Sequence, residues 1–120
     1  MSEAEPVHHS INYIEFSVTD MEIAKEFYSQ AFGWEFTDYG PSYVGIQKSG
    51  GGECGGFALV DQVSTGGPLV ILYSSSLEES LASVVTAGGK TTRDIFEFPG
   101  GRRFQFLDPS GNELAVWSEN

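Results

Sequence analysis

The chain has little positive charge and almost no cysteine. Cys54 is its only cysteine, so an intrachain disulfide or a zinc site built from cysteine ligands is excluded. Only 6 of the 120 residues are Lys or Arg against 17 Asp and Glu, which gives a formal net charge of −11. Such a surface repels the phosphates of nucleic acids and of anionic membranes. We therefore expect neither nucleic acid nor membrane among the partners.

Long apolar stretches are also missing. No run approaches the roughly 20 residues that cross a bilayer. The first residues, MSEAEP, are acidic and lack the apolar core of a secretory signal, so we expect a cytoplasmic protein. The 40% of hydrophobic residues can still form the core of one globular domain. Residues 1–10 are polar and are expected to form a loose arm before a single domain at residues 11–120.

Hydrophobic periodicity divides this domain into two segments of the same order. In the first segment, side chains of the core-facing and the opposite face alternate from Ile11 to Val18, with Ile14, Phe16 and Val18 on the apolar face, which predicts a strand. Asp20 is a typical helix N-cap and Gly33 a typical left-handed helix end. The next three strands are expected near residues 34–38, 43–48 and 56–61, and the glycine-rich stretch 49–56 is interpreted as a flexible hairpin connection.

The second segment repeats this order. A strand is expected at residues 69–73, a capping box at Ser76–Glu79 opens a helix, and Gly88 and Gly89 end it. The last three strands are expected near residues 90–93, 102–107 and 113–117. The predicted fold class is therefore α+β, with tandem βαβββ modules at residues 11–62 and 67–118. A helix lies outside each module.

A shift of 56 positions places Gly33 on Gly89 and Ala31 on Ala87, which indicates an internal duplication. If each helix covers one face of its sheet, the opposite face combines aromatic side chains with a few polar groups. That mixture is typical of a ligand pocket. The predicted pocket residues are Tyr13, Glu15, Tyr43, Phe57, Tyr73, Arg103, Gln105 and Trp117.

Two stretches, INYIEFSVTDMEIAKEFYSQAFGWEF and GGRRFQFLDPSGNELAVW, resemble the vicinal oxygen chelate superfamily. This superfamily comprises glyoxalases, bleomycin-resistance proteins and extradiol dioxygenases. The first stretch has its strand, VTD helix cap and FGW helix end, and the second has its closing hairpin with DPxGN. The resemblance implies a cup-shaped mixed β-sheet made from paired βαβββ modules. In enzymatic members, His, Gln or Glu side chains hold a divalent metal in this cup.

The resemblance also implies where metal ligands would lie. Those positions are occupied by Tyr13, Leu59, Leu69 and Ala115. Tyr is a rare ligand and the other three side chains have no donor atom. We therefore predict no metal and no other cofactor, and leave enzymatic activity open. The predicted function is binding of a small, partly apolar molecule in the cup.

The alternative is a metal-dependent lyase or dioxygenase with displaced ligands such as Glu15 and Glu113. A plainer interpretation of these carboxylates is that Glu15 pairs with Arg103 across the cup and Glu113 faces solvent. His8 and His9 lie in the polar arm and are interpreted as a surface or disordered pair rather than as metal ligands.

The outer strands of two modules would leave exposed sheet edges, and exposed edges aggregate unless they are paired. We therefore predict a homodimer. Light scattering at tens of micromolar should report twice the chain mass of 13.0 kDa. A monomer at that concentration would contradict the prediction.

Overall fold

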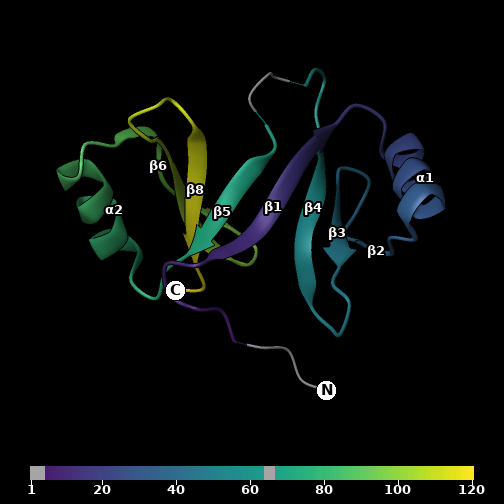
Figure 1. Ribbon diagram of the computed structural model, residues 1–120, viewed down its shortest axis with the longest axis horizontal. Helices are drawn as coiled ribbons and strands as arrows, with labels where there is room; N and C mark the ends of the chain where they lie inside the picture. Colours follow the sequence, from purple (N-terminus) through teal and green to yellow (C-terminus); the bar gives the residue numbers. More distant parts are fainter. Residues whose placement is uncertain (1–4, 64–66) are drawn as a thin grey trace. The chain divides into compact units, whose positions relative to one another are not determined.

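Figure 1 shows the computed structural model, which describes residues 5–63 and 67–120. Contacts divide the described chain into two units. The first lies within Tyr13–Pro68, and the second combines Glu5–Asn12 with Leu69–Asn120. Each unit carries one helix and four strands of a mixed sheet, which confirms the predicted α+β class with a βαβββ order in each half. Among the described residues, no helix is long and apolar enough to cross a membrane.

The first unit is built on four neighbouring strands in the order β2-β3-β4-β1. β1 and β4 run parallel, and β3 is antiparallel to both of its neighbours. Its elements are β1 (Ile11–Val18), α1 (Met21–Phe32), β2 (Phe36–Asp38), β3 (Tyr43–Gln47) and β4 (Glu53–Leu59). β4 begins inside the glycine-rich stretch, so half of the expected flexible connection is strand.

The predicted ends of α1 are confirmed. Asp20 Oδ1 accepts a hydrogen bond from the Ile23 backbone N–H at 3.0 Å, which satisfies a donor of the first turn. At the other end Gly33 has φ 74°, and its N–H donates to the Ser29 carbonyl. A residue with a side chain would be strained in this left-handed conformation.

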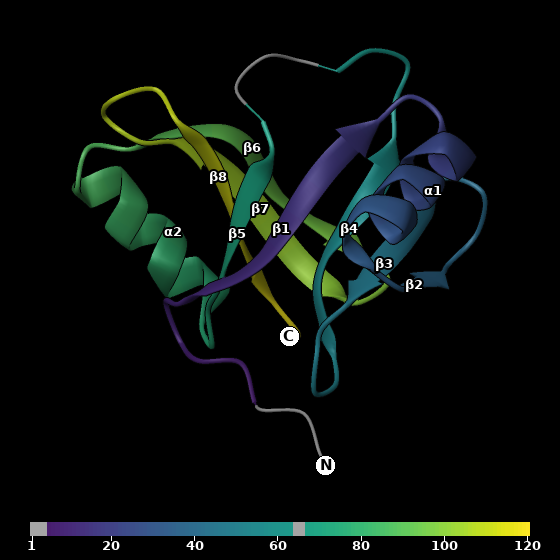
Figure 2. The same ribbon diagram turned by 45° about the vertical axis from the view of Figure 1, so that its right-hand side comes forward.

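α1 covers one face of the first unit's sheet (Figure 2). The core beneath it is buried between Met21 of the helix and alternate residues of the strands. Its buried members are Met21, Val44, Ile46 and Phe57, and Phe16, Val18, Ala24, Tyr28, Trp34 and Phe36 pack around them. Aromatic rings dominate this core, with Phe57 meeting Phe16 edge-on at 5.8 Å between ring centroids.

The second unit follows the same plan with the strand order β5-β8-β7-β6. β5 and β8 are parallel, whereas β7 is antiparallel to β6 and β8. Its elements are β5 (Leu69–Tyr73), α2 (Leu77–Thr86), β6 (Lys90–Phe98), β7 (Gly101–Leu107) and β8 (Glu113–Ser118). The core under α2 contains Leu72, Leu77, Leu81, Val84, Ile95, Phe104, Phe106, Leu114 and Val116.

The start of α2 differs from the predicted capping box. Ser76 is the N-cap residue, but its side chain makes no capping hydrogen bond. The preceding Ser74 is buried and takes over part of this role, because its Oγ accepts from the Ser76 N–H at 3.0 Å and contacts Ser80 Oγ at 2.6 Å.

The arm at residues 5–10 is attached to the second unit rather than loose. The His9 N–H donates to the Tyr73 carbonyl at 2.6 Å, and His9 Nε2 lies 3.0 Å from Ser80 Oγ. His8 Nδ1 accepts from the Ser75 N–H at 2.9 Å. These bonds connect the arm to β5 and to the start of α2.

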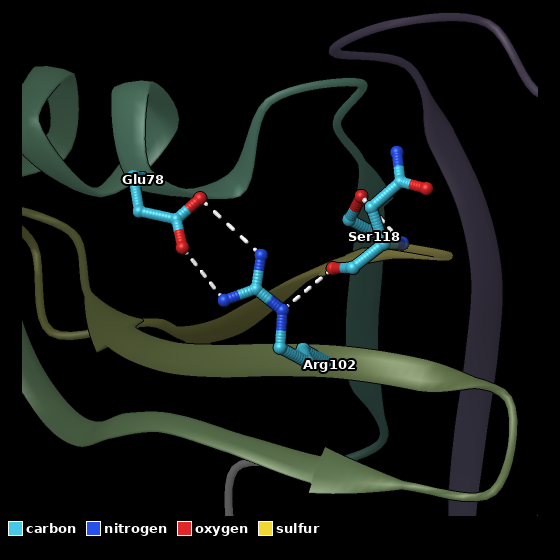
Figure 3. A network of polar contacts seen from close by, with 4 residues as sticks. Glu78, Arg102 and Ser118 are labelled. Atoms are coloured by element: carbon cyan, nitrogen blue, oxygen red, sulfur yellow. Dashed lines mark hydrogen bonds and ion pairs between the residues drawn. The ribbon is translucent and has the colours of Figure 1, made fainter.

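The C-terminal residues of the second unit are held by hydrogen bonds of Arg102, as Figure 3 shows. The Arg102 guanidinium of β7 donates to both carboxylate oxygens of Glu78, at 2.6 and 3.3 Å. Its Nε donates to the Asn120 carbonyl at 2.5 Å. The ion pair with Arg102 lowers the pKa of Glu78. One side chain thus connects β7, α2 and the chain end.

The element order is the same in the two units, but the spacing between equivalent residues is not constant. Glu15 of β1 pairs with Gly56, and Ile71, 56 positions after Glu15, pairs with Ala115 of β8. Ala115 lies 59 positions after Gly56, so the offset grows by three between the helix and the last strand. β6, with 9 residues against 3 in β2, is the longer element of the second unit.

This change of spacing corrects two predictions. A constant shift of 56 put Phe57 and Leu59 on the face opposite the helix, but they pair with Phe16 and Val18 of the core face. Phe57 is 0% exposed and belongs to the core under α1, so it is not a pocket residue. The position equivalent to Ala115 is therefore Gly56 and not Leu59.

Replacing Phe57 by Ala should lower the free energy of unfolding by about 3–5 kcal/mol, because it leaves a cavity among the packed rings. The exposed Phe27 of α1 is the matched control, and its replacement by Ala should cost less than about 1 kcal/mol. Urea unfolding measures both values. If both variants lost a similarly small amount of unfolding free energy, Phe57 would not be a core residue and its original assignment to the opposite face would stand.

Candidate functional site

The sheet face opposite α1 carries the polar side chains of the first unit. Strand alternation sends Tyr13 and Glu15 of β1 and Tyr43 of β3 to this face, because their neighbours Phe16 and Val44 enter the core. Glu15 pairs with Gly56 of β4, and Gly56 pairs with Gly45 of β3. Two glycines therefore lie between the polar side chains of three adjacent strands.

A chain of hydrogen bonds runs across this face. The Tyr43 hydroxyl donates to Glu15 Oε2 at 3.0 Å, and the hydroxyls of Tyr13 and Tyr43 are 2.8 Å apart. Nearby, the Tyr39 hydroxyl donates to the carboxylate of Glu53. Three phenols and two carboxylates thus belong to one unit, and each phenol is hydrogen-bonded.

The two glycines provide the space for these groups. A Cβ built on Gly56 would lie 2.5 Å from the Tyr43 hydroxyl and 2.6 Å from that of Tyr13. A Cβ on Gly45 would overlap the Glu53 carboxylate, which therefore lies across the backbone of β3. Any larger residue at either position would displace the hydrogen-bonded groups.

Burial raises the pKa of Tyr13 to about 12, and the carboxylates of Glu53 and Glu15 contribute in the same direction. Burial also raises the pKa of Tyr43, and the adjacent Glu15 carboxylate raises it further. Both phenols are therefore neutral over the physiological range. They act as hydrogen-bonding groups and not as bases.

The face opposite α2 in the second unit is more aromatic. Tyr73 of β5 and Trp117 of β8 meet edge-on with ring centroids 5.3 Å apart. Trp117 Nε1 donates to Asn12 Oδ1 at 3.0 Å. Because its one hydrogen-bond donor is satisfied, the indole presents its ring as apolar surface.

Polar side chains of β7 lie beside these rings. Arg103 Nη2 donates to Gln105 Oε1 at 3.2 Å, and Gln105 Nε2 donates to Glu113 Oε2 at 3.1 Å. The Arg103 guanidinium also lies 5.4 Å from the ring centroid of Phe96, within the range of a cation–π contact. Gln105 pairs with Ala115, which is buried.

The structure thus places seven of the eight predicted pocket residues on the faces opposite the helices. Tyr13, Glu15 and Tyr43 meet in the first unit, and Tyr73, Arg103, Gln105 and Trp117 share a face in the second, whereas Phe57 is in the core.

Sequence reasoning missed Asn12, Tyr39, Glu53 and Phe96. The period-2 pattern that places Tyr13 and Glu15 gives no role to Asn12. Glu53 was missed because it lies in the glycine-rich stretch, which we interpreted as a flexible connection rather than as the start of a strand.

The residues at the metal-ligand positions that the resemblance implies do not fit a divalent ion. These positions hold Tyr13, Gly56, Leu69 and Ala115. Tyr13 is protonated and already hydrogen-bonded, and the other three offer no side-chain donor atom. Among residues 5–63 and 67–120, no three His, Cys, Asp or Glu side chains are grouped so that they could hold a metal.

A family model described as Glyoxalase/Bleomycin resistance protein/Dioxygenase superfamily matches residues 10–116. A glyoxylase-like domain-containing protein of Didymella fabae is 28% identical over 92% of this chain and 94% of its own length. A putative glyoxylase of Mycobacterium tuberculosis is 24% identical over 91% of this chain, which spans 45% of that relative.

Two solved structures share the fold. The Mn(II)-bound glyoxalase from Novosphingobium aromaticivorans has a TM-score of 0.71 at 23% identity, covering 93% of this chain and 39% of that one. Methylmalonyl-CoA epimerase from Mycobacterium tuberculosis has a TM-score of 0.71 at 12% identity, covering 99% of this chain and 93% of that one. At these identities the likeness concerns the fold alone.

The raised pKa values of Tyr13 and Tyr43 predict a loss of stability at high pH. A phenol in the unfolded chain ionises near pH 10, below its folded value, so its contribution is complete below about pH 10 and is lost as the pH rises toward about 12. Urea unfolding at several pH values should show this decline. The Tyr13→Phe/Tyr43→Phe double variant should decline less steeply, and parallel curves would contradict the assignment.

Proposed function

Because the chain belongs to the Glyoxalase/Bleomycin resistance protein/Dioxygenase superfamily, whose model matches residues 10–116, we propose that it binds a small, partly apolar molecule. The binding surfaces are the sheet faces opposite α1 and α2, and no divalent metal takes part. One observation carries this proposal. The chain has the superfamily's sheet, but the metal-ligand positions that the resemblance implies hold Tyr13, Gly56, Leu69 and Ala115, and the last three have no side-chain donor atom.

The side chains on the two faces support recognition of such a molecule. The second unit offers the rings of Tyr73 and Trp117, which suit a planar or apolar group. The first unit offers the hydroxyls of Tyr13 and Tyr43 and the Glu15 carboxylate, held in one arrangement by their mutual hydrogen bonds. Binding sites commonly combine apolar walls with a few polar groups fixed in this way.

The second candidate function is a metal-dependent lyase or dioxygenase with Glu15 and Glu113 as displaced ligands. Both carboxylates are already hydrogen-bonded. Glu15 accepts from Tyr43, and Glu113 Oε2 accepts from Thr92 at 2.7 Å and from Gln105 at 3.1 Å. A metal would have to replace these bonds at each site, so metal-free binding is favoured over this alternative.

A neutral apolar dye tests the proposal. N-phenyl-1-naphthylamine should bind saturably to protein purified without a metal-affinity tag, and prior dialysis against EDTA should leave the dissociation constant unchanged. Trp117→Leu should weaken binding about fivefold, because an aromatic contact contributes roughly 1 kcal/mol. Val85→Ala, on the exposed surface of α2, is the control and should bind the dye as the wild type does.

Two outcomes would contradict the proposal. Absence of saturable dye binding would remove the binding function. A near-stoichiometric metal in elemental analysis, lost in the Glu15→Gln or Glu113→Gln variant, would favour the lyase or dioxygenase.

A further inference from the structure

The hydrogen-bond chain on the first unit's face has a direction. It ends at Glu15, whose carboxylate accepts from the Tyr43 hydroxyl. A phenol has a single hydrogen, and Tyr43 donates its hydrogen to Glu15 Oε2 at 3.0 Å. The hydrogen in the 2.8 Å contact between Tyr13 and Tyr43 must therefore come from Tyr13. The chain runs from Tyr13 through Tyr43 to Glu15.

This direction fixes what the face can offer to a ligand. The hydrogen of Tyr13 is donated to Tyr43, and that of Tyr39 is donated to the Glu53 carboxylate. None of the three phenols has a second hydrogen to donate. The Tyr13 oxygen still has lone pairs, and the carboxylates of Glu15 and Glu53 are acceptors as well. The Tyr13 oxygen and the two carboxylates can therefore accept a hydrogen bond from a ligand, whereas the phenols have no further hydrogen to donate to it.

Charge and space favour the same kind of ligand. Tyr13 is half-buried, and Gly56 beside it has no side chain that would cover its hydroxyl. The carboxylates of Glu15 and Glu53 both act on Tyr13 electrostatically, and their field attracts the positive end of an incoming O–H or N–H bond. Because Tyr13 donates its hydrogen to Tyr43, its oxygen also becomes a stronger acceptor.

We propose that the Tyr13 oxygen is a hydrogen-bond acceptor for the bound molecule, so that the site selects ligands with a hydroxyl or N–H group over ligands that offer only an ether or carbonyl oxygen. This inference rests on the proposed binding function. It adds the ligand class, and it assigns Tyr43 and Glu15 as positioning residues that orient the Tyr13 hydroxyl.

A matched pair of ligands tests the selectivity. 4-Ethylphenol and 4-ethylanisole share a ring and an alkyl group, but only the phenol carries a hydrogen on oxygen. Each is titrated against the dye-loaded protein, and the displacement of N-phenyl-1-naphthylamine gives its dissociation constant. 4-Ethylphenol should bind roughly tenfold more tightly, as one hydrogen bond to a polarised acceptor implies.

Two variants separate orientation from simple packing. Tyr13→Phe removes the acceptor and should abolish the preference for the phenol. Tyr43→Phe leaves the Tyr13 hydroxyl in place but removes the partner that takes its hydrogen, so Tyr13 can then donate. 4-Ethylanisole should bind more tightly to this variant than to the wild type, a gain that lost packing would not produce. Val85→Ala, on the exposed surface of α2, is the control and should retain the preference.

The outcomes distinguish the two proposals. If the dye binds saturably but the two ligands bind equally well, the ligand class is wrong and the binding function stands. A preference that survives Tyr13→Phe, or an ether affinity unchanged by Tyr43→Phe, also overturns the assignment of Tyr13. If no saturable dye binding occurs, the binding function is wrong and the ligand class falls with it.

Discussion

The parallel register between β1 and β4 determines where the functional side chains of the first unit lie. Ile14 is opposite Gly55, and a Cβ on that glycine would overlap the Ile14 carbonyl oxygen. With this register Phe16 and Phe57 meet in the core under α1, while Glu15 lies beside Gly56 on the other face. A slip of one residue would exchange the two faces and bring the Glu15 carboxylate into a core of aromatic rings.

The polar face is stable because its groups satisfy one another. Half-buried hydroxyls and carboxylates are costly when they lack partners, but here Tyr13, Tyr43 and Glu15 form a continuous chain. Burial keeps the two phenols protonated, and their hydrogens maintain the chain's direction. The glycines at positions 45 and 56 are part of this arrangement, because a side chain at either would overlap the polar groups.

The repeated plan separates the residues that hold the sheet together from those on its other face. Each unit repeats the order βαβββ and places a helix over one face, so the sheet is stabilised by the cores around Phe57 and Phe104. Those cores make no use of the opposite faces. The residues on those faces can therefore vary without loss of the packing that holds the strands.

The sequence by itself determined the element order, both helix positions and the α+β class, because these depend on local signals: alternation in β1, the Asp20 cap and the Gly33 helix end. It also assigned Tyr13, Glu15 and Tyr43 to one face of the sheet, from strand alternation and the assumption that the helix covers the other face. Only the tertiary structure decided the register of β4. A fixed repeat offset put Phe57 on the wrong face, because the offset changes where β6 is longer than β2. The tertiary structure also decided the direction of the hydrogen-bond chain and the approach of Tyr39 to Glu53, which depend on contacts between residues distant in sequence.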